Sequence, residues 1–316
     1  MQSNPANPGN WPSIPYADWR NTAITLQLWT QIVGKVRLTL SPWLNHGWQV
    51  PLYVNTRGLG TSPIHLGDGL LEIDFDFIDQ RLVVTTSEGT ARGFKLEPMS
   101  VATFYRRLMS ELQAAGLDVK INVMPSEVPQ PVRFPDDHLH ASYDAQAVLH
   151  FWRALVQADR LLRLFRTSFL GKASPVHFFW GSFDLAVTRF SGRIAPRHPG
   201  GIPGLRDDIT REAYSHEVSS AGFWAGSDAY PQAAFYSYAY PTPPGFDKAN
   251  VKPEGATWSA EMGNWLLPYD LVRTAGDPDA AVLSFLRTTY DAAASLSAWD
   301  RTLDCELGQP RRPRLV

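Results

Sequence analysis

The sequence predicts an α+β fold with two similar helix–antiparallel sheet–helix units, an internal duplication packed as one compact body. Three observations support this. A short series of residue types occurs twice, each time after a helical pattern. Strand-like segments alternate between apolar and polar residues and turn back on themselves, which indicates antiparallel hairpins. The helical patterns stand in groups beside the strands, as is typical of α+β proteins.

The repeated series has the same order in both halves. The first contains Gly34-Lys35, Ser41-Pro42, His46, Trp48, Leu52, Val54, Arg57 and Gly58. The second contains Gly171-Lys172, Ser174-Pro175, His177, Trp180, Leu185, Val187, Arg189 and Gly192. Self-similarity of this kind indicates duplicated structural units. Because duplicated halves commonly pack around a shared cleft, we expect His46 and His177 to meet there.

The first unit begins with a helix over about 21–33, which has one apolar side. Strands follow at 49–56, 71–78 and 81–86. The second of these alternates cleanly, with Leu71, Ile73, Phe75 and Phe77 on one face and Glu72, Asp74 and Asp76 on the other. The acidic stripe is most simply the solvated face of a hairpin. A helix from the N-cap Ser100 to Gly116 ends the unit.

The second unit opens with the longest helix, from Asp144 to Gly171. Strand candidates follow at 176–179, 183–189, 214–221, 234–240 and 264–267. Asp277-Pro278 starts a last helix, with proline at its first position. The extra length of this half lies in two Gly/Pro-rich stretches, 194–208 and 225–263. Long loops on a rigid scaffold often carry binding sites.

These patterns give a simple division of the chain. We expect a flexible N-terminal segment over 1–15, a first α+β repeat over 16–125 and a Pro-rich linker over 126–143. A second α+β repeat with long loops over 144–300 and a flexible C-terminal tail over 301–316 complete it.

Composition excludes several classes of protein. The net charge of −2 favours neither nucleic acid nor an anionic membrane as a partner. Cys305 is the single cysteine, so the sequence predicts neither a disulfide framework nor a thiolate metal cluster. No apolar run approaches 18 residues and no signal-peptide pattern is present. We therefore expect a cytoplasmic protein with a small-molecule ligand; the oligomeric state is unknown.

The candidate catalytic residues come from two polar segments of the second half. The strand beginning Tyr214-Ser215-His216-Glu217 places many polar groups where an apolar core strand would not. Either it has one solvated face, or His216 and Glu217 transfer protons or bind a ligand. His177 precedes an aromatic run and has Asp184 seven positions later. An imidazole oriented by a carboxylate is a common base or metal ligand; the alternative is a core histidine bonded to backbone.

We expect His177, Asp184, His216 and Glu217 to surround one cleft. Its substrate-binding wall would contain Trp180, Arg189, Tyr214, Trp224, Tyr236, Tyr238 and His46. The phenolic stripe of this wall either lines a pocket or packs under a loop. If a metal binds, His177, His216 and Glu217 suit a divalent ion such as Zn²⁺, Mn²⁺ or Fe²⁺. If none binds, His216 would act as base and Arg189 would hold an anionic group.

Three long strings carry a resemblance to a known family. They are Trp29–Leu38 (WTQIVGKVRL), Ser174–Arg193 (SPVHFFWGSFDLAVTRFSGR) and Thr210–Trp224 (TREAYSHEVSSAGFW). In these stretches the chain resembles an uncharacterised bacterial domain-of-unknown-function family, number 5996 in that series, from about residue 11 to 299. The resemblance implies a stand-alone bacterial cytoplasmic protein. It implies no activity, cofactor or catalytic residue.

Standard catalytic motifs are absent from the sequence: there is no P-loop, no nucleophile elbow and no His-Glu-x-x-His. We therefore expect a small-molecule enzyme, a metal-assisted hydrolase or lyase with a His/Asp/Glu site in the second repeat. The alternative is a non-catalytic small-ligand-binding protein with an aromatic pocket. A third class, a partner-binding module, would require a large exposed apolar patch.

Overall fold

The computed structural model describes residues 11–202 and 204–306. The first unit contains α1 (Tyr16–Leu40), β1 (Tyr53–Val54), β2 (Gly58–Gly60), β3 (Ile64–Leu66), β4 (Gly69–Asp76), β5 (Arg81–Thr86), β6 (Ala91–Lys95) and α2 (Val101–Ala114). The second contains α3 (Ala145–Arg166), β7 (His177–Phe179), β8 (Asp184–Ile194), α4 (Asp207–Ala213), β9 (His216–Trp224), β10 (Ala234–Tyr240), β11 (Thr257–Ser259), β12 (Asn264–Pro268), α5 (Tyr269–Arg273) and α6 (Pro278–Leu296).

The α+β prediction is confirmed, because both sheets are antiparallel and helices flank them in groups. One sheet has the order β1-β2-β4-β5-β6, and β3 pairs with β4 beside β2. The other has the order β11-β12-β10-β9-β8-β7. Each unit is thus a long helix, an antiparallel meander and a closing helix. This common order is compatible with a duplicated unit, to which β3, α4, β11 and α5 are additions.

The repeated residues do not all occupy equivalent places. Gly34 and Lys35 lie inside α1, whereas Gly171 and Lys172 lie in the loop after α3. Leu52, which the sequence pattern aligns with Leu185, pairs instead with Phe178 at the junction of the sheets. The two units therefore share an order of elements, but the short series is out of register with it.

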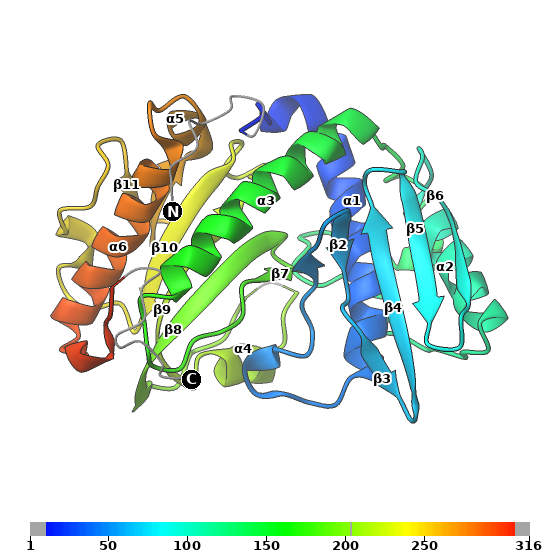
Figure 1. The fold of residues 1–316 in the computed structure, drawn as a ribbon, viewed down its shortest axis with the longest axis horizontal. Coiled ribbons are helices and arrows are strands. Elements are labelled where there is room, and N and C mark those ends of the chain that lie inside the picture. The colour runs from blue at the N-terminus through cyan, green and yellow to red at the C-terminus, as the bar shows by residue number, and fades with distance from the viewer. Residues whose placement is uncertain (1–10, 203, 307–316) are drawn as a thin grey trace, which may run out of the picture.

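The edges of the two sheets meet at a single antiparallel bridge. The Leu52 amide donates to the Phe178 carbonyl at 2.9 Å, and the Phe178 amide donates to the Leu52 carbonyl at 2.8 Å. In Figure 1, α3 and α6 cover one face of the β7–β12 sheet, while α1 and α2 lie against the β1–β6 sheet. The core is continuous across the junction, since the Phe151 ring of α3 lies 5.0 Å from the Trp19 ring of α1.

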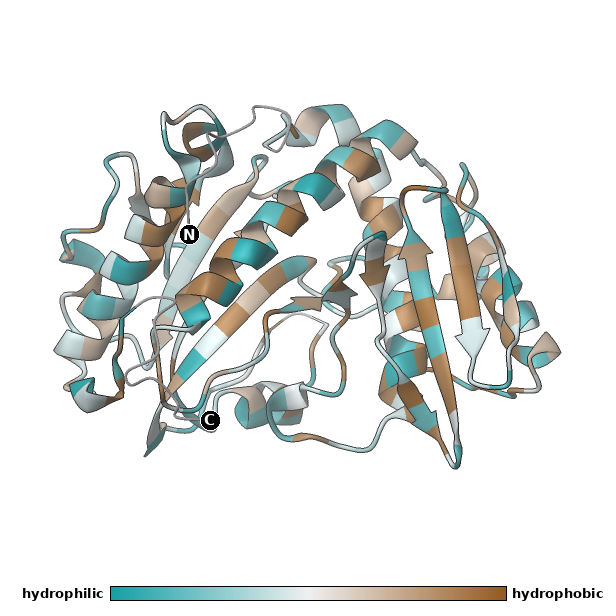
Figure 2. Ribbon diagram, in the orientation of Figure 1, coloured by the Kyte–Doolittle hydropathy of each residue, from teal (hydrophilic) through white to brown (hydrophobic). Residues whose placement is uncertain are grey.

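The alternating pattern of β4 is confirmed as the origin of a one-sided sheet. Figure 2 shows hydrophobic and hydrophilic residues in turn along this strand. The side chains of Leu71, Ile73 and Phe75 are fully buried. The acidic stripe on the other face is less solvated than expected, because Asp76 is only 7% exposed.

Two segments expected to be flexible are packed where the structure describes them. Trp11 is 4% exposed, and its ring lies 5.9 Å from that of Tyr269. At the other end, Tyr290 donates to Asp304 at 2.6 Å and the Leu170 amide donates to the Leu303 carbonyl. The expectation is therefore wrong for residues 11–15 and 301–306. Residues 1–10 and 307–316 lie outside the described residues.

Within the described part of the chain, no helix combines the length and the apolar character that crossing a membrane requires.

The junction between the sheets makes a first prediction. Phe178 is fully buried and its ring packs against Phe151 and Phe183. The substitution Phe178→Ala should lower the free energy of unfolding by about 3–5 kcal/mol, because it leaves a cavity between the units. Urea denaturation measures this. Leu139→Ala is the control, since Leu139 is exposed; an equal loss in both variants would contradict the prediction.

Candidate functional site

A polar cluster occupies the face of the β7–β12 sheet that turns away from α3 and α6. Residues of β8 alternate, so Leu185 and Val187 enter the helix-covered core while Asp184 points to the opposite face. Strand register places Ala186, Gly222 and Tyr236 side by side in one row of that face. The next row contains Thr188, Ser220 and Tyr238.

Asp184 is at the centre of the cluster and only 8% exposed. The Tyr236 hydroxyl donates to one of its carboxylate oxygens and the Ser182 hydroxyl to the other. The hydroxyl oxygens of Tyr214 and Tyr238 lie 2.9 Å apart. Glu127 belongs to the same group: its Oε1 lies beside Gly181, the Asp184 charge raises its pKa, and its own charge contributes to raising the pKa of Tyr214. We call Glu127, Asp184, Tyr214, Tyr236 and Tyr238 the phenol–carboxylate cluster.

Small residues in the middle strand make the cluster possible. Tyr236 stands on β10 and Asp184 on β8, so the phenol must cross β9 to reach the carboxylate. It crosses over Gly222, where a Cβ atom would lie 2.5 Å from the Tyr236 hydroxyl oxygen and 2.2 Å from the Leu185 carbonyl oxygen. Glycine is therefore required at this position, because the Leu185 carbonyl and the Tyr236 hydroxyl leave no room for a Cβ atom.

Helix α1 positions the segment that carries Glu127. Three polar residues at helical spacing, Gln27, Gln31 and Lys35, lie on one side of the helix. Gln27 Nε2 donates to the Gly181 carbonyl at 2.6 Å. Gln31 bonds both backbone groups of Ser126, and Lys35 Nζ donates to the Met124 carbonyl at 2.8 Å. These bonds hold the two segments that bring Glu127 against Gly181.

Glycines allow Glu127 its close fit. A Cβ atom on Gly181 would lie 2.1 Å from Glu127 Oε1, and one on Gly204 would lie 2.7 Å from the Glu127 amide nitrogen. Glu127 itself has a φ of 56°, which is uncommon for a residue with a side chain. The segment around Glu127 thus packs against Gly181 and Gly204 in a tightly specified conformation.

Both carboxyl groups are electrostatically unfavourable as anions. Burial raises the pKa of Asp184, and burial together with the Asp184 charge raises the pKa of Glu127 to about 7. Burial also raises the pKa of Tyr214, Tyr236 and Tyr238. Among the described residues, no Lys, Arg or His forms an ion pair with either carboxyl group. Glu127 can therefore change its protonation state near neutral pH.

His177 lies on the same face as the cluster. It pairs with Ala186, whereas Asp184 pairs with Phe179, so His177 and Asp184 are diagonal neighbours roughly 7–8 Å apart. The imidazole is 1% exposed, and its Nδ1 has no hydrogen-bond partner among the described residues. Burial lowers the pKa of His177 to about 3, so the ring is neutral. A core histidine bonded to backbone, the alternative interpretation, is not what the structure contains.

Two of the expected site residues lie on the wrong face. Arg189 enters the helix-covered core, stacks 3.6 Å from the Phe165 ring centre and donates to Ser168 Oγ at 2.8 Å. Glu217 accepts from Arg193 at 2.7 Å and from Ser191 at 2.8 Å. Because adjacent strand residues point to opposite faces, Glu217 cannot join His216 in one site.

His216 is on the correct face but far along the sheet. It pairs with Ile194 at the end of β8, whereas His177 pairs with Ala186 near its start. The expected metal ligands His177, His216 and Glu217 therefore do not converge. The described residues contain no group of three or more His, Cys, Asp or Glu side chains placed to hold a metal ion.

His46 meets His216 rather than His177. The two rings are 6.0 Å apart, and His46 Nε2 accepts from Lys172 Nζ at 2.6 Å. The His46 amide donates to Glu212, and His46 adopts a left-handed φ of 61°. Burial and the Lys172 charge lower the pKa of His46. The histidine pair links the two units but is separate from the phenol–carboxylate cluster.

The remaining wall residues divide in the same way. Trp224 pairs with Asp184 on the cluster face and stacks on Tyr230 at 5.9 Å. Trp180 packs on α1, where a Cβ atom on Gly34 would collide with its ring, and Trp180 Nε1 donates to the Val50 carbonyl at 3.0 Å. Trp180 therefore packs between the two units, and its hydrogen bond goes to Val50 and not to the cluster.

Glu127 was not identified from the sequence. It lies between Pro125 and Pro129 in the expected linker, far in sequence from Asp184, and no periodic pattern marks it. The polar row of α1 was a usable signal, since Gln27, Gln31 and Lys35 recur at helical spacing among the apolar residues of its central part. Buried polar groups require partners, so the row indicated that a polar segment packs there.

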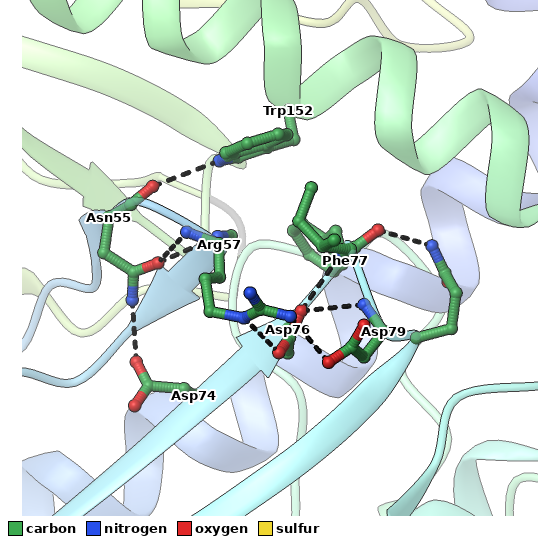
Figure 3. Close-up of polar contacts among 10 residues, drawn as sticks. Asn55, Arg57, Asp74, Asp76, Phe77, Asp79 and Trp152 are labelled. Atoms are coloured by element: carbon green, nitrogen blue, oxygen red, sulfur yellow. Dashed lines mark hydrogen bonds and ion pairs between the residues drawn. The ribbon is translucent and has the colours of Figure 1, made fainter.

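A second buried carboxylate, in the first unit, provides a contrast. Figure 3 shows Asp76 between Arg57 and the backbone amides that follow it, with Asn55 donating to Asp74 at 2.7 Å. The Arg57 guanidinium contributes to holding the pKa of Asp76 below its usual value. Asp76 is compensated by a cation, and Asp184 is not.

Comparison with known proteins adds a family. A family model described as a family of unknown function (DUF5996) matches residues 11–305. The chain belongs to this family. No curated protein matches the chain, and no solved structure does. Family membership thus brings no activity to the chain, and the argument for function rests on the cluster.

The space over β9 makes a second prediction. Gly222→Ala should lower the free energy of unfolding by about 1–3 kcal/mol and displace the Tyr236 hydroxyl from Asp184, because the new methyl group meets backbone and phenol together. Thermal unfolding and tyrosine absorbance at high pH would measure both effects. Gly276→Ala is the matched control, since nothing lies near its Cβ position. Equal stability of the two variants would contradict the prediction.

The buried imidazole makes a third prediction. With a pKa near 3 in the folded state and 6.5 unfolded, His177 binds protons mainly in the unfolded state between these values. Its contribution to stability is therefore present above pH 6.5 and is lost as the pH falls, by about 3 kcal/mol at pH 4. His177→Leu should remove this acid sensitivity in urea denaturation at pH 7 and pH 4. If the free energy of unfolding falls by the same amount from pH 7 to pH 4 in the wild type and in the variant, the prediction is refuted.

Proposed function

We propose that the protein is a small-molecule enzyme that uses the phenol–carboxylate cluster for general acid–base catalysis of a hydrolase or lyase type. The observation that supports it is the proximity of two carboxyl groups, the buried Asp184 and the half-buried Glu127, with no cationic partner among the described residues. Uncompensated buried carboxyl groups are unfavourable for stability, and such groups are concentrated at catalytic sites.

The two carboxyl groups suit different roles. Glu127 has a pKa of about 7 and receives no hydrogen bond from the described residues, so it is the group that can take up and release a proton. Asp184 accepts from Tyr236 and Ser182, which fix its orientation. Two carboxyl groups that lie near each other but in different environments are typical of acid–base pairs. The hydroxyls of Tyr214 and Tyr238 would hydrogen-bond the substrate.

The proposal replaces the metal-assisted mechanism expected from the sequence. His216 and Glu217 lie outside the cluster, so the imidazole–carboxylate ligand set does not form there. We assign His177 the role of a neutral hydrogen-bonding group beside Asp184.

We also propose that the protein is bacterial and cytoplasmic. The single cysteine, Cys305, is free, which suits a reducing compartment.

The second candidate is a non-catalytic small-ligand-binding protein. The aromatic character of the face favours it, because Tyr214, Tyr236 and Tyr238 supply ring surface as well as hydroxyls. Binding without turnover distinguishes this candidate from an enzyme.

A fourth prediction tests the proposed activity. Purified protein incubated with a metabolite extract should consume one metabolite and form another over time, as followed by mass spectrometry. Glu127→Gln and Asp184→Asn should each reduce the rate at least about 100-fold, the usual contribution of a positioned acid or base. The wild-type rate should follow a pH profile with a limb near pH 7, from Glu127.

Asp76→Asn is the matched control, because Asp76 is as buried as Asp184 but lies in the first unit. It should leave the rate unchanged. Retention of a metabolite without conversion would identify a binding protein. Equal conversion by wild type and Asp184→Asn would remove the cluster from the mechanism.

A further inference from the structure

The phenol–carboxylate cluster offers hydrogen-bond acceptors and negative charge, and its described part contains no cation. Asp184 accepts from Ser182, and Glu127 Oε1 lies against the neighbouring Gly181, so both supply carboxylate oxygens close to this turn. Lys35, whose Nζ is committed to the Met124 carbonyl and Ser126 hydroxyl, makes no ion pair with them. Resting on the function proposed above, we infer that the substrate of this site carries a protonated amine, bound between the two carboxyl groups and the phenol rings.

The phenol rings support a cationic substrate independently of the carboxyl groups. Tyr236 and Tyr238 stack with ring centres 6.2 Å apart and nearly parallel planes, and the Tyr214 ring lies 6.2 Å from that of Tyr238. The faces of aromatic rings attract an ammonium group, most strongly in a desolvated site. Three rings beside two carboxyl groups form the kind of surface that organic cations prefer.

His177 is a second, separate indication of a ligand. Its ring is almost completely buried on the cluster face, and Nδ1 has no partner among the described residues. A buried polar atom without a partner is destabilising, so a site that retains one has a use for it. In the tautomer that carries its proton on Nε2, the neutral imidazole presents Nδ1 as an acceptor, and an ammonium group offers only donors. The unpaired Nδ1 therefore gives an amine a hydrogen-bond partner on the cluster face.

A metal ion fits the cluster less well than an organic cation. The cluster supplies two carboxyl groups, and no group of three metal-binding side chains occurs in the described residues. The faces of phenol rings attract an organic cation, whereas phenols are not among the usual ligands of first-row metal ions. The geometry therefore favours a nitrogen cation.

Binding of an amine should release protons. Near pH 7 Glu127 in the free cluster is partly protonated, because burial and the Asp184 charge raise its pKa to about 7. A bound ammonium group stabilises its carboxylate form, so protons leave as the amine enters. A neutral compound would release no protons, and an anionic one would favour proton uptake.

The test uses four small probes of matched size and the metal ions alone. Isothermal titration calorimetry with n-butylamine, tetramethylammonium, n-butanol and butyrate should show binding of the two cations at least tenfold tighter than of the other two. ZnCl₂ and MgCl₂ are titrated separately. In weakly buffered solution at pH 7, phenol red should report release of up to about half a proton per butylamine bound, because Glu127 with a pKa near 7 is about half protonated there.

Two variants assign the effect to the cluster. Glu127→Gln should weaken butylamine binding at least tenfold and abolish proton release, whereas Asp76→Asn should behave as wild type. If thermal unfolding shows that Glu127→Gln does not fold, Tyr238→Phe and Asp184→Asn replace it, each with a similar loss of affinity expected.

The inference is overturned if butanol or butyrate binds as tightly as butylamine, if no amine binds, or if Zn²⁺ binds at micromolar concentration while the amines do not. These results leave the proposed function separately testable. Conversion of a neutral or anionic metabolite that depends on Asp184 would preserve the enzyme and exclude the amine.

Discussion

Helix α1 is buried on two sides, and the arrangement of both units depends on this. Its apolar residues, such as Trp29, pack in the first unit against Phe104 and Tyr143. Its polar row of Gln27, Gln31 and Lys35 faces the segments at Gly181 and Ser126. These hydrogen bonds hold the two segments and, through them, the position of Glu127.

The protein buries carboxylates in two physically different ways. Asp76 is surrounded by Arg57 and backbone amides, which hold its negative charge (Figure 3). Asp184 is surrounded by hydroxyls, phenol rings and a second carboxyl group, which leave its charge uncompensated. The first arrangement stabilises the fold as it stands. The second is unfavourable until a proton or a cationic group arrives, which is why we assign function to Asp184 and not to Asp76.

Complementary residue sizes across three strands build the cluster. The middle strand β9 contributes Gly222 and Ser220, and the large phenols of β10 lie over them toward β8. The stripe of tyrosines was visible in the sequence, and its two interpretations, a pocket wall or an edge under a loop, were both open. In the structure, the Tyr236 hydroxyl bonds to Asp184, and the Tyr238 hydroxyl bonds to that of Tyr214.

Local patterns in the sequence determined the α+β class, the hairpin of β4 and β5, the helix caps at Ser100, Asp144 and Asp277, and the placement of Asp184 and the tyrosines, because alternation and capping act over a few residues. Only the tertiary structure decided which polar residues meet. Glu217 and Arg189 do not join the cluster, because adjacent residues of a strand point to opposite faces of the sheet. Glu127 joins the cluster because the linker segment that carries it is hydrogen-bonded to α1, which places it near Asp184 of β8. No local pattern carries information about such long-range contacts, so the site could be only half predicted.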